Sequence, residues 1–151
     1  MSKAVVLDAG PLGLATNPNL SPEASACTQW LASLLAADVE VCLPEIADYE
    51  VRRELLRAGK AKGLERLNAL KVSLRYLPLT TATMLTAAEL WARARNEGHP
   101  TAEDAALDAD VILAAQALAL KGRGYDTVIA TTNPAHLDRF ATAKAWAEIR
   151  V

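Results

Sequence analysis

Short apolar runs alternate with longer amphipathic stretches along this chain. Runs rich in β-branched residues predict buried strands, because such side chains pack well on a pleated surface. Stretches that open on a capping residue and close on a glycine predict helices. The predicted strands are 3–7, 39–43, 73–77, 126–131 and 144–149, and the predicted helices are 21–37, 44–59, 61–70, 80–96 and 108–121. Strands that alternate with helices are typical of an α/β domain with a mostly parallel central sheet flanked by helices.

Three segments have weaker patterns. Ala9-Gly10-Pro11, directly after the first strand, is expected to break the strand and turn the chain. Residues 99–107 look irregular or briefly helical, and residues 134–140 predict a short turn or helix. We find no stretch with the composition of a linker, so residues 1–151 are expected to form a single domain.

The composition narrows the class of protein. Of the 151 residues, 52% are hydrophobic and the formal net charge is −2, which excludes a disordered chain and predicts a real core. The apolar runs are too short to span a bilayer, and the amino-terminal one is too short for a signal peptide. Cys27 and Cys42 lie in apolar surroundings and form no metal-binding motif. We therefore expect buried free thiols and a cytoplasmic location.

Two polar residues stand where predicted strands end. Asp8 ends the first strand, and Asn133 follows the strand 126–131 by two residues. Ligands of open α/β sheets bind outside the carboxyl ends of the strands, so both side chains are expected at one edge. The alternatives are local: Asp8 orders the turn at Gly10-Pro11, and Asn133 caps the helix that begins at Pro134. For Asn133 both interpretations stay open.

The helix after Pro44 carries two acids on a face bounded by apolar residues. Glu50 and Glu54 lie there, whereas an exposed acid is expected on the polar side near Asp48 and Arg52. A half-buried carboxylate is unfavourable unless a cation or a donor satisfies it. We interpret Glu50 as functional. For Glu54 we favour an ion pair with a neighbouring arginine.

The helix 108–121 is apolar nearly all round, which predicts the central packed helix of the domain. Asp110 shares its side with Ala114 and Ala117, whose small side chains leave room around the carboxylate. Asp108 faces the same site only if it lies in the turn before the helix. Its more ordinary role is an N-terminal cap or a partner of the helix dipole.

Asp8, Glu50 and Asp110 are thus three carboxylates on separate elements that could converge. Like charges at a few ångströms repel unless a cation lies between them. Oxygen ligands favour Mg²⁺ or Mn²⁺ over zinc, and His99 and His136 form no zinc-binding spacing. His136 is close enough to Asn133 in the sequence to reach a substrate phosphate.

Positive charge is concentrated in one segment. Residues 52–71 contain seven basic and two acidic side chains, a local charge of +5 in a protein of net charge −2. A solvated helix face explains this equally well, but a basic surface beside acids also suits an enzyme that acts on a phosphodiester chain. Arg53, Arg57 and Lys60 are the predicted phosphate contacts.

Four pieces of the sequence match one family in order and on the expected elements. They are Val-Val-Leu-Asp8, Pro44-Glu-Ile-Ala-Asp-Tyr-Glu50, Asp110-Val-Ile-Leu-Ala-Ala-Gln-Ala and Ala130-Thr-Thr-Asn133-Pro-Ala-His-Leu-Asp-Arg-Phe140. From Val5 to Ile149 the chain resembles PIN-domain proteins, including the VapC-type toxins. The resemblance implies a hydrolase, a Mg²⁺- or Mn²⁺-dependent endoribonuclease that is often a homodimer, acts on RNA and, as a toxin, has an antitoxin partner.

The resemblance also assigns residues. Asp8, Glu50 and Asp110 match the core metal-binding and catalytic acids, and Asn133 occupies a position where family members often have a fourth acid. Asp108 and Asp138 are candidates to replace that acid. The alternative is a catalytically weak or inactive PIN-like interaction or scaffold domain. A phosphatase of the haloacid dehalogenase type is disfavoured, because Gly10 stands where its second acid belongs.

Overall fold

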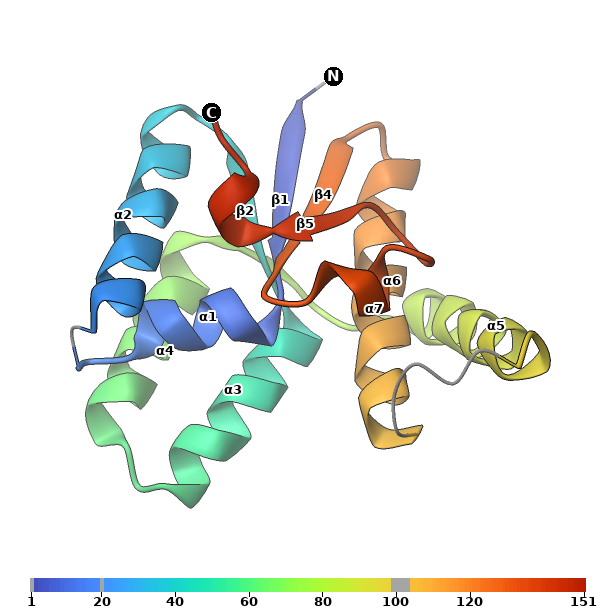
Figure 1. Cartoon of the computed structure of the whole chain (residues 1–151), viewed down its shortest axis with the longest axis horizontal. Coiled ribbons are helices and arrows are strands. Elements are labelled where there is room, and N and C mark those ends of the chain that lie inside the picture. Colours follow the sequence, from blue (N-terminus) through green and yellow to red (C-terminus); the bar gives the residue numbers. More distant parts are fainter. Residues whose placement is uncertain (1, 20, 99–103) are drawn as a thin grey trace.

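Five parallel strands form one sheet in the order β3-β2-β1-β4-β5 (Figure 1). The structure is a computed structural model and describes residues 2–19, 21–98 and 104–151. The strands are β1 (Lys3–Leu7), β2 (Glu40–Pro44), β3 (Arg75–Leu77), β4 (Asp126–Thr131) and β5 (Ala143–Ala145). The helices are α1 (Ala9–Thr16), α2 (Pro22–Ala36), α3 (Glu45–Arg57), α4 (Ala61–Ser73), α5 (Thr81–Asn96), α6 (Asp104–Gly122) and α7 (Pro134–Leu137). The α/β architecture with a parallel sheet is therefore confirmed.

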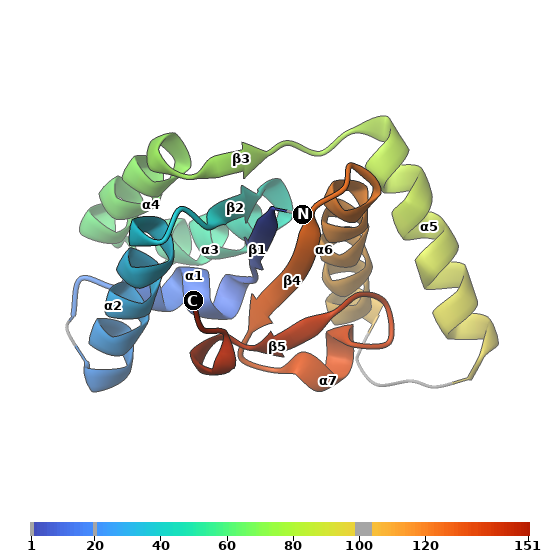
Figure 2. The ribbon, with the colours of Figure 1, turned by 90° about the horizontal axis from the view of Figure 1, so that it is seen from above.

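Alternate residues of β1 point to opposite faces of the sheet, and each face has its own core. Val5 and Leu7 pack against α1, α2 and α4, whereas Ala4 and Val6 pack against α6. A third apolar cluster joins the outer side of α6 to α5, which is the outermost helix on that side (Figure 2). Because both faces are covered, the central strands β1, β2 and β4 are mostly apolar after their first residues, as in other parallel sheets.

The direction of the strands decides which residues lie together. In a parallel sheet, each helix that follows a strand begins at the carboxyl edge. Asp8 directly follows β1, and α3 directly follows β2, whereas α6 runs back to the amino end of β4. The amino-terminal half of α6 is therefore brought to the same edge as Asp8 and the start of α3.

Helix α1 is a feature that the sequence did not reveal. Asp8 caps it, since its Oδ1 accepts a hydrogen bond from the Ala9 N–H at 2.7 Å. Pro11 lies in the first turn, where a missing N–H costs little. Gly10 allows close packing, because a Cβ there would lie 2.7 Å from the Thr132 side chain. The strand ends before Ala9-Gly10-Pro11, as expected, but this segment also begins a helix that was not expected.

Other boundaries also differ from those expected. Helix α4 runs to Ser73, past its expected end at 70, so β3 begins at Arg75 and not at 73. Helix α6 begins at Asp104, so residues 104–107 are helical, and residues 99–103 lie outside the described part of the chain. The last strand is short, and residues 146–148 form a 3₁₀ helix instead of continuing it. Trp146 packs on Trp30 with ring centroids 5.5 Å apart, and this contact ends the strand by turning the chain onto α2.

Both cysteines are free and buried, as expected. Burial raises the pKa of the Cys27 thiol to about 11 and that of Cys42 to about 12, so both are protonated near neutral pH. Within the described ranges, no helix has the length and apolar character needed to cross a membrane.

Candidate functional site

Asp8 is held at the carboxyl end of the central strand by two hydrogen bonds. Its Oδ1 accepts from the Ala9 N–H, and its Oδ2 accepts from the Thr131 hydroxyl at 2.8 Å. Burial raises the pKa of Asp8, and these two donors oppose the rise by stabilising the carboxylate. Each carboxylate oxygen of Asp8 thus accepts one hydrogen bond, and the two bonds fix the position of the side chain.

Glu50 lies half-buried on α3, in the electric field of the other two acids. Burial raises the pKa of Glu50 to about 7, and the charges of Asp8 and Asp110 add to the rise, whereas Arg53 opposes it. A carboxyl with a pKa near neutrality is one that would bind a cation or a proton readily. Its position agrees with the apolar helix face on which the sequence placed it.

Asp110, on α6, is the third acid at this edge. Burial and the charge of Asp8 raise the pKa of Asp110 to about 6, and Arg139 opposes the rise. Asp8 thus acts on both Glu50 and Asp110, and three carboxyl groups from three separate elements lie within electrostatic reach of one another. We call Asp8, Glu50 and Asp110 the acidic site.

The chemistry of the acidic site fits a divalent cation. Burial raises the pKa of all three carboxyl groups, and the charge of Asp8 adds to the rise at Glu50 and Asp110; a cation among them would oppose these effects. In the part of the chain that the structure describes, no three Asp, Glu, His or Cys side chains approach closely enough to form a complete ligand set. The donors suit Mg²⁺ or Mn²⁺, and their side chains would have to move closer to hold it.

Thr131 links Asp8 to Asn133, and sequence reasoning missed it. The Thr131 hydroxyl donates to Asp8, and its oxygen accepts from the backbone N–H of Asn133 at 3.0 Å. Thr131 is 1% exposed at the end of β4, and its hydroxyl contacts Asp8, which directly follows the neighbouring strand β1. A hydroxyl at the last position of the strand next to Asp8 was the signal that could have identified it.

Asn133 does not cap α7 with its side chain. Its Nδ2 instead lies 3.4 Å from Nδ1 of His136, on the exposed side of the turn. The capping interpretation is therefore wrong. Asn133 and His136 are left at the same edge as Asp8, with their polar groups facing solvent.

Asp108 lies on the opposite side of α6 from Asp110, because residues two positions apart on a helix are about 200° apart. Asp108 is exposed within α6, where it borders a groove formed with Met84 and Trp91 of α5. Because α6 begins at Asp104, the expectation that Asp108 caps the helix is wrong, and it does not lie in a preceding turn. Asp138 is exposed after α7, and its Oδ1 accepts a long hydrogen bond from the Ala143 N–H.

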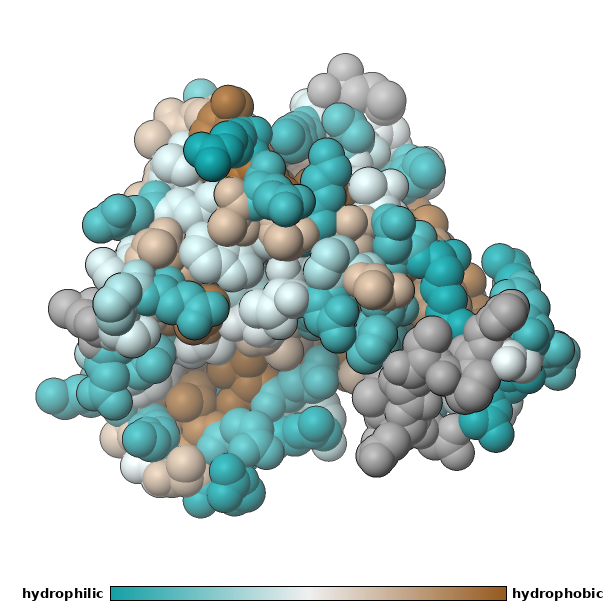
Figure 3. Space-filling model, viewed as in Figure 1, coloured by the Kyte–Doolittle hydropathy of each residue, from teal (hydrophilic) through white to brown (hydrophobic). Residues whose placement is uncertain are grey.

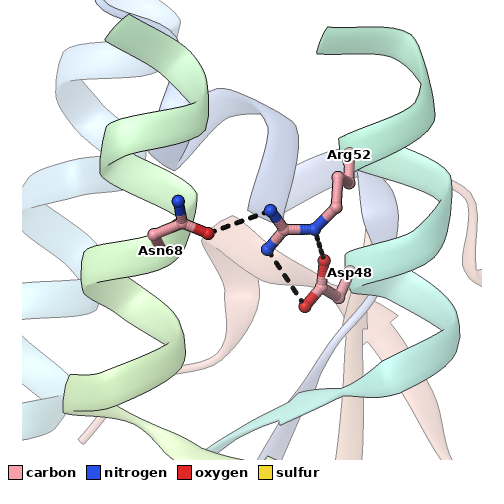
Figure 4. A network of polar contacts seen from close by, with 3 residues as sticks. All are labelled: Asp48, Arg52 and Asn68. Atoms are coloured by element: carbon pink, nitrogen blue, oxygen red, sulfur yellow. Dashed lines mark hydrogen bonds and ion pairs between the residues drawn. The ribbon is translucent and has the colours of Figure 1, made fainter. Parts of the chain in front are cut away.

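Asp48, which was expected on the exposed polar side of α3, is buried in the structure. Asp48 is only 4% exposed and forms an ion pair with Arg52, at 2.7 Å between Oδ1 and Nε (Figure 4). Arg52 also donates to Oδ1 of Asn68 on α4 at 2.9 Å. This network ties α3 to α4, so Arg52 has a structural role, and the expected exposed acid at Asp48 is wrong.

Arg53, Arg57 and Lys60, here called the basic strip, are exposed along α3 and the turn after it. Arg57 forms an ion pair with Glu54 at 2.8 Å, which confirms the interpretation of Glu54. A groove between α1 and α3 is lined by Glu50 at one end and by Arg57 and Lys60 at the other. Figure 3 shows apolar surface in the region of these helices, bordered by hydrophilic side chains.

The chain belongs to the PIN domain family, whose model matches residues 5–142. PIN domains are generally nucleases, and such nucleases generally use divalent metals. The family indicated by the sequence is thereby confirmed. No curated protein sequence matches the chain significantly.

Solved structures with the same fold are VapBC and Fit proteins. The chain is similar to VapBC2 from Rickettsia felis bound to a promoter DNA fragment, with 15% identity, a TM-score of 0.70 and coverage of 95% of this chain and 98% of that one. VapBC-1 from nontypeable Haemophilus influenzae is 14% identical, with a TM-score of 0.68 and coverage of 96% of this chain and 99% of that one. FitAcB from Neisseria gonorrhoeae is 19% identical, with a TM-score of 0.67 and coverage of 96% of this chain and 99% of that one. At these identities the likeness establishes the fold.

Proposed function

We propose that this protein is a Mg²⁺- or Mn²⁺-dependent endoribonuclease of the VapC type. The observation that carries the proposal is the acidic site, in which Asp8 after β1 meets Glu50 of α3 and Asp110 of α6 at the carboxyl edge, and the charge of Asp8 raises the pKa of both. Cleavage of RNA by the purified protein with Mg²⁺ or Mn²⁺, and none with a chelator, is the test. Failure to cleave under both metals would contradict the proposal.

The residues of the acidic site have distinct tasks in this proposal. A bound divalent cation supplies charge stabilisation to the scissile phosphate and to an attacking water. Asp8, fixed by Thr131 and Ala9, and Asp110 hold the cation directly. Glu50 holds it or orients the water, and its half-buried carboxylate can accept a proton from that water.

The basic strip supplies the contacts to the RNA backbone. Arg53, Arg57 and Lys60 lie on exposed positions that lead away from Glu50 along α3. Phosphate contacts fix the position of a nucleic acid without reading its sequence. Arg57 has to leave Glu54 or share its charge with it to bind a phosphate.

An antitoxin-type protein is the proposed partner. The VapBC neighbours are toxin–antitoxin complexes, which supports such a partner for this chain. A small antitoxin gene directly upstream is the expected genomic arrangement. A homodimer stays a prediction, supported by the exposed apolar residues Met84, Leu85 and Trp91 on α5.

A second candidate function is a PIN domain that binds partners without cleaving RNA. Asn133 supports it, because family members often have an acid at that position and Asn133 lies exposed beside His136. The two functions differ in metal-dependent cleavage. Activity gained only in Asn133→Asp, with none in the unaltered protein, would favour the second.

Metal binding is expected to stabilise the fold. Mg²⁺ or Mn²⁺ at a concentration a hundredfold above Kd should raise the free energy of unfolding by about 2.7 kcal/mol, because the ion binds the folded state. Calorimetry and thermal melting measure this. Asp8→Asn combined with Asp110→Asn should abolish binding, and Asn133→Asp should tighten it through one more charged oxygen. Unchanged binding in the double variant would place the metal elsewhere.

Removing the charges of the basic strip is expected to weaken RNA binding regardless of sequence. In Arg53→Gln with Arg57→Gln and Lys60→Gln, the slope of log affinity against log salt should fall by about 0.7 for each lost contact to a single strand. Titrations at several salt concentrations measure the slope. Arg93→Gln, on α5, serves as the control. An unchanged slope would show that the RNA binds another surface.

A further inference from the structure

Tyr49 is an exposed aromatic residue directly beside the acidic site. It precedes Glu50 on α3 and is 56% exposed, whereas its neighbour Asp48 is buried. It belongs to none of the three apolar clusters of the described residues. The core therefore does not require this ring, and more than half of the residue is accessible to solvent.

The charge next to Tyr49 is positive. The Arg53 guanidinium lies over the Tyr49 ring, 5.0 Å from its centroid. The same guanidinium is near enough to Glu50 to oppose the rise of that residue's pKa. Successive helix residues are about 100° apart, which places Arg53 between Tyr49 and Glu50 on the helix surface. Tyr49, Arg53 and Glu50 thus form a continuous surface.

This surface matches the two chemical parts of a single-stranded nucleotide. The arginines of the basic strip can follow the phosphates, and an aromatic ring backed by a cation can hold a base. Stacking of this kind needs an unpaired base, and it tolerates any base because each has a π face. A duplex keeps its bases within its own stack and would gain nothing from the ring.

We propose that Tyr49, backed by Arg53, is a stacking surface for one unpaired base of the RNA, next to the acidic site. The proposal rests on the proposed nuclease function and adds a preference for single strands. It makes Tyr49 a binding residue for the nucleotide that enters the site. No base is read by hydrogen bonding, so the preference concerns strandedness and not sequence.

The test is a double-mutant cycle that combines one change in the protein with one change in the RNA. The protein carries Asp8→Asn to prevent cleavage, and the probe is a labelled single-stranded oligoribonucleotide in which one nucleotide at a time is abasic. Tyr49→Leu should weaken binding about tenfold, and so should the abasic change at one position. Combined, the two changes should weaken binding by no more than either alone, because both remove the same contact.

Matched variants separate stacking from general damage. Tyr49→Phe keeps the ring and should keep the affinity. Tyr125→Leu removes another aromatic ring that lies under an arginine, with the Arg75 guanidinium 5.0 Å from its centroid, and should leave the affinity unchanged, because Tyr125 precedes β4 at the amino edge of the sheet. With Asp8 intact, Tyr49→Leu should raise KM for single-stranded RNA and change kcat little.

The outcomes distinguish this proposal from the nuclease proposal. If the unaltered protein cleaves RNA while Tyr49→Leu keeps its affinity and KM, the stacking surface is overturned and the nuclease stands. Two further results would overturn the stacking surface: additive losses of affinity in the cycle, or an equal loss of affinity for duplex RNA. A role of Tyr49 in binding a protein partner is among the cases that these results would reveal. If the unaltered protein neither binds nor cleaves RNA, both proposals fall.

Discussion

Changing any one of Asp8, Glu50 or Asp110 to its amide is expected to lower kcat/KM for RNA cleavage by about two orders of magnitude or more. Each carboxylate helps to hold one cation, so the loss of one disturbs the whole ligand set. A second change should then cost much less than the product of the two single effects, because the residues act as a unit. Cleavage rates of the single and double variants, measured at saturating metal, provide the comparison.

Glu54→Gln is the matched control for this experiment. Glu54 lies one helical turn from Glu50, but its partner is Arg57, and both side chains are exposed. An exposed pair contributes little to stability, so the variant should fold normally and keep its kcat. Full activity in any amide variant of the acidic site would remove that residue from the proposed mechanism. Multiplicative losses would mean that the three acids do not share one ion.

Glu50→Gln is expected to stabilise the metal-free protein above neutral pH while it abolishes cleavage. The pKa of Glu50 is raised to about 7 in the folded protein, above its value in the unfolded chain. The folded state therefore binds the proton more tightly, and stability falls as the pH rises from about 4.5 through 7. After allowance for solvent screening of this half-exposed group, the gain at pH 8 should be roughly 1–2 kcal/mol.

Denaturant unfolding of the metal-free protein between pH 4 and 8 measures this difference. The two proteins should be equally stable near pH 4, where Glu50 is protonated in both states, and should diverge as the pH rises. Saturating Mg²⁺ should reverse the order, because the unaltered protein keeps its ligand and the variant does not. A variant that is less stable at pH 8 without metal would show that Glu50 has a structural partner there.

These two expectations have one physical origin. Carboxylates placed together for a cation are unfavourable neighbours when the cation is absent, since burial and mutual repulsion both disfavour their charged forms. Asp8 is partly compensated by Thr131 and the Ala9 N–H, whereas the rise in pKa is opposed by Arg53 at Glu50 and by Arg139 at Asp110. The site thus loses stability locally in exchange for affinity toward metal.

The periodic elements could be predicted from local physics. Strand 126–131 and the caps at Ser21 and Thr80 are where the sequence places them, because β-branched runs and capping hydroxyls act over only a few residues. The alternation of these elements was enough for the parallel sheet. It also placed Asp8 at the carboxyl edge, and helix periodicity placed Glu50 on a half-buried face.

Tertiary packing decided what local patterns leave open. Helix α1 contains two glycines and a proline, and it forms because Asp8 caps it and its apolar residues complete the core over the sheet. Asp48 looked exposed on its helix, but Arg52 and Asn68 of α4 allow it to be buried. Asp108 and Asp110 were ambiguous until the start of α6 at Asp104 fixed their directions.

The sequence by itself determined the architecture, the family resemblance and the residue types of the acidic site, because these depend on local order along the chain. Only the tertiary structure decided that Asp8 acts electrostatically on both Glu50 and Asp110 and that Thr131 orients Asp8. Charge interactions and side-chain hydrogen bonds act through space across distances of a few ångströms. They join Asp8 to Asp110 and to Thr131, each more than a hundred positions away, and local periodicity has no signal for such pairs.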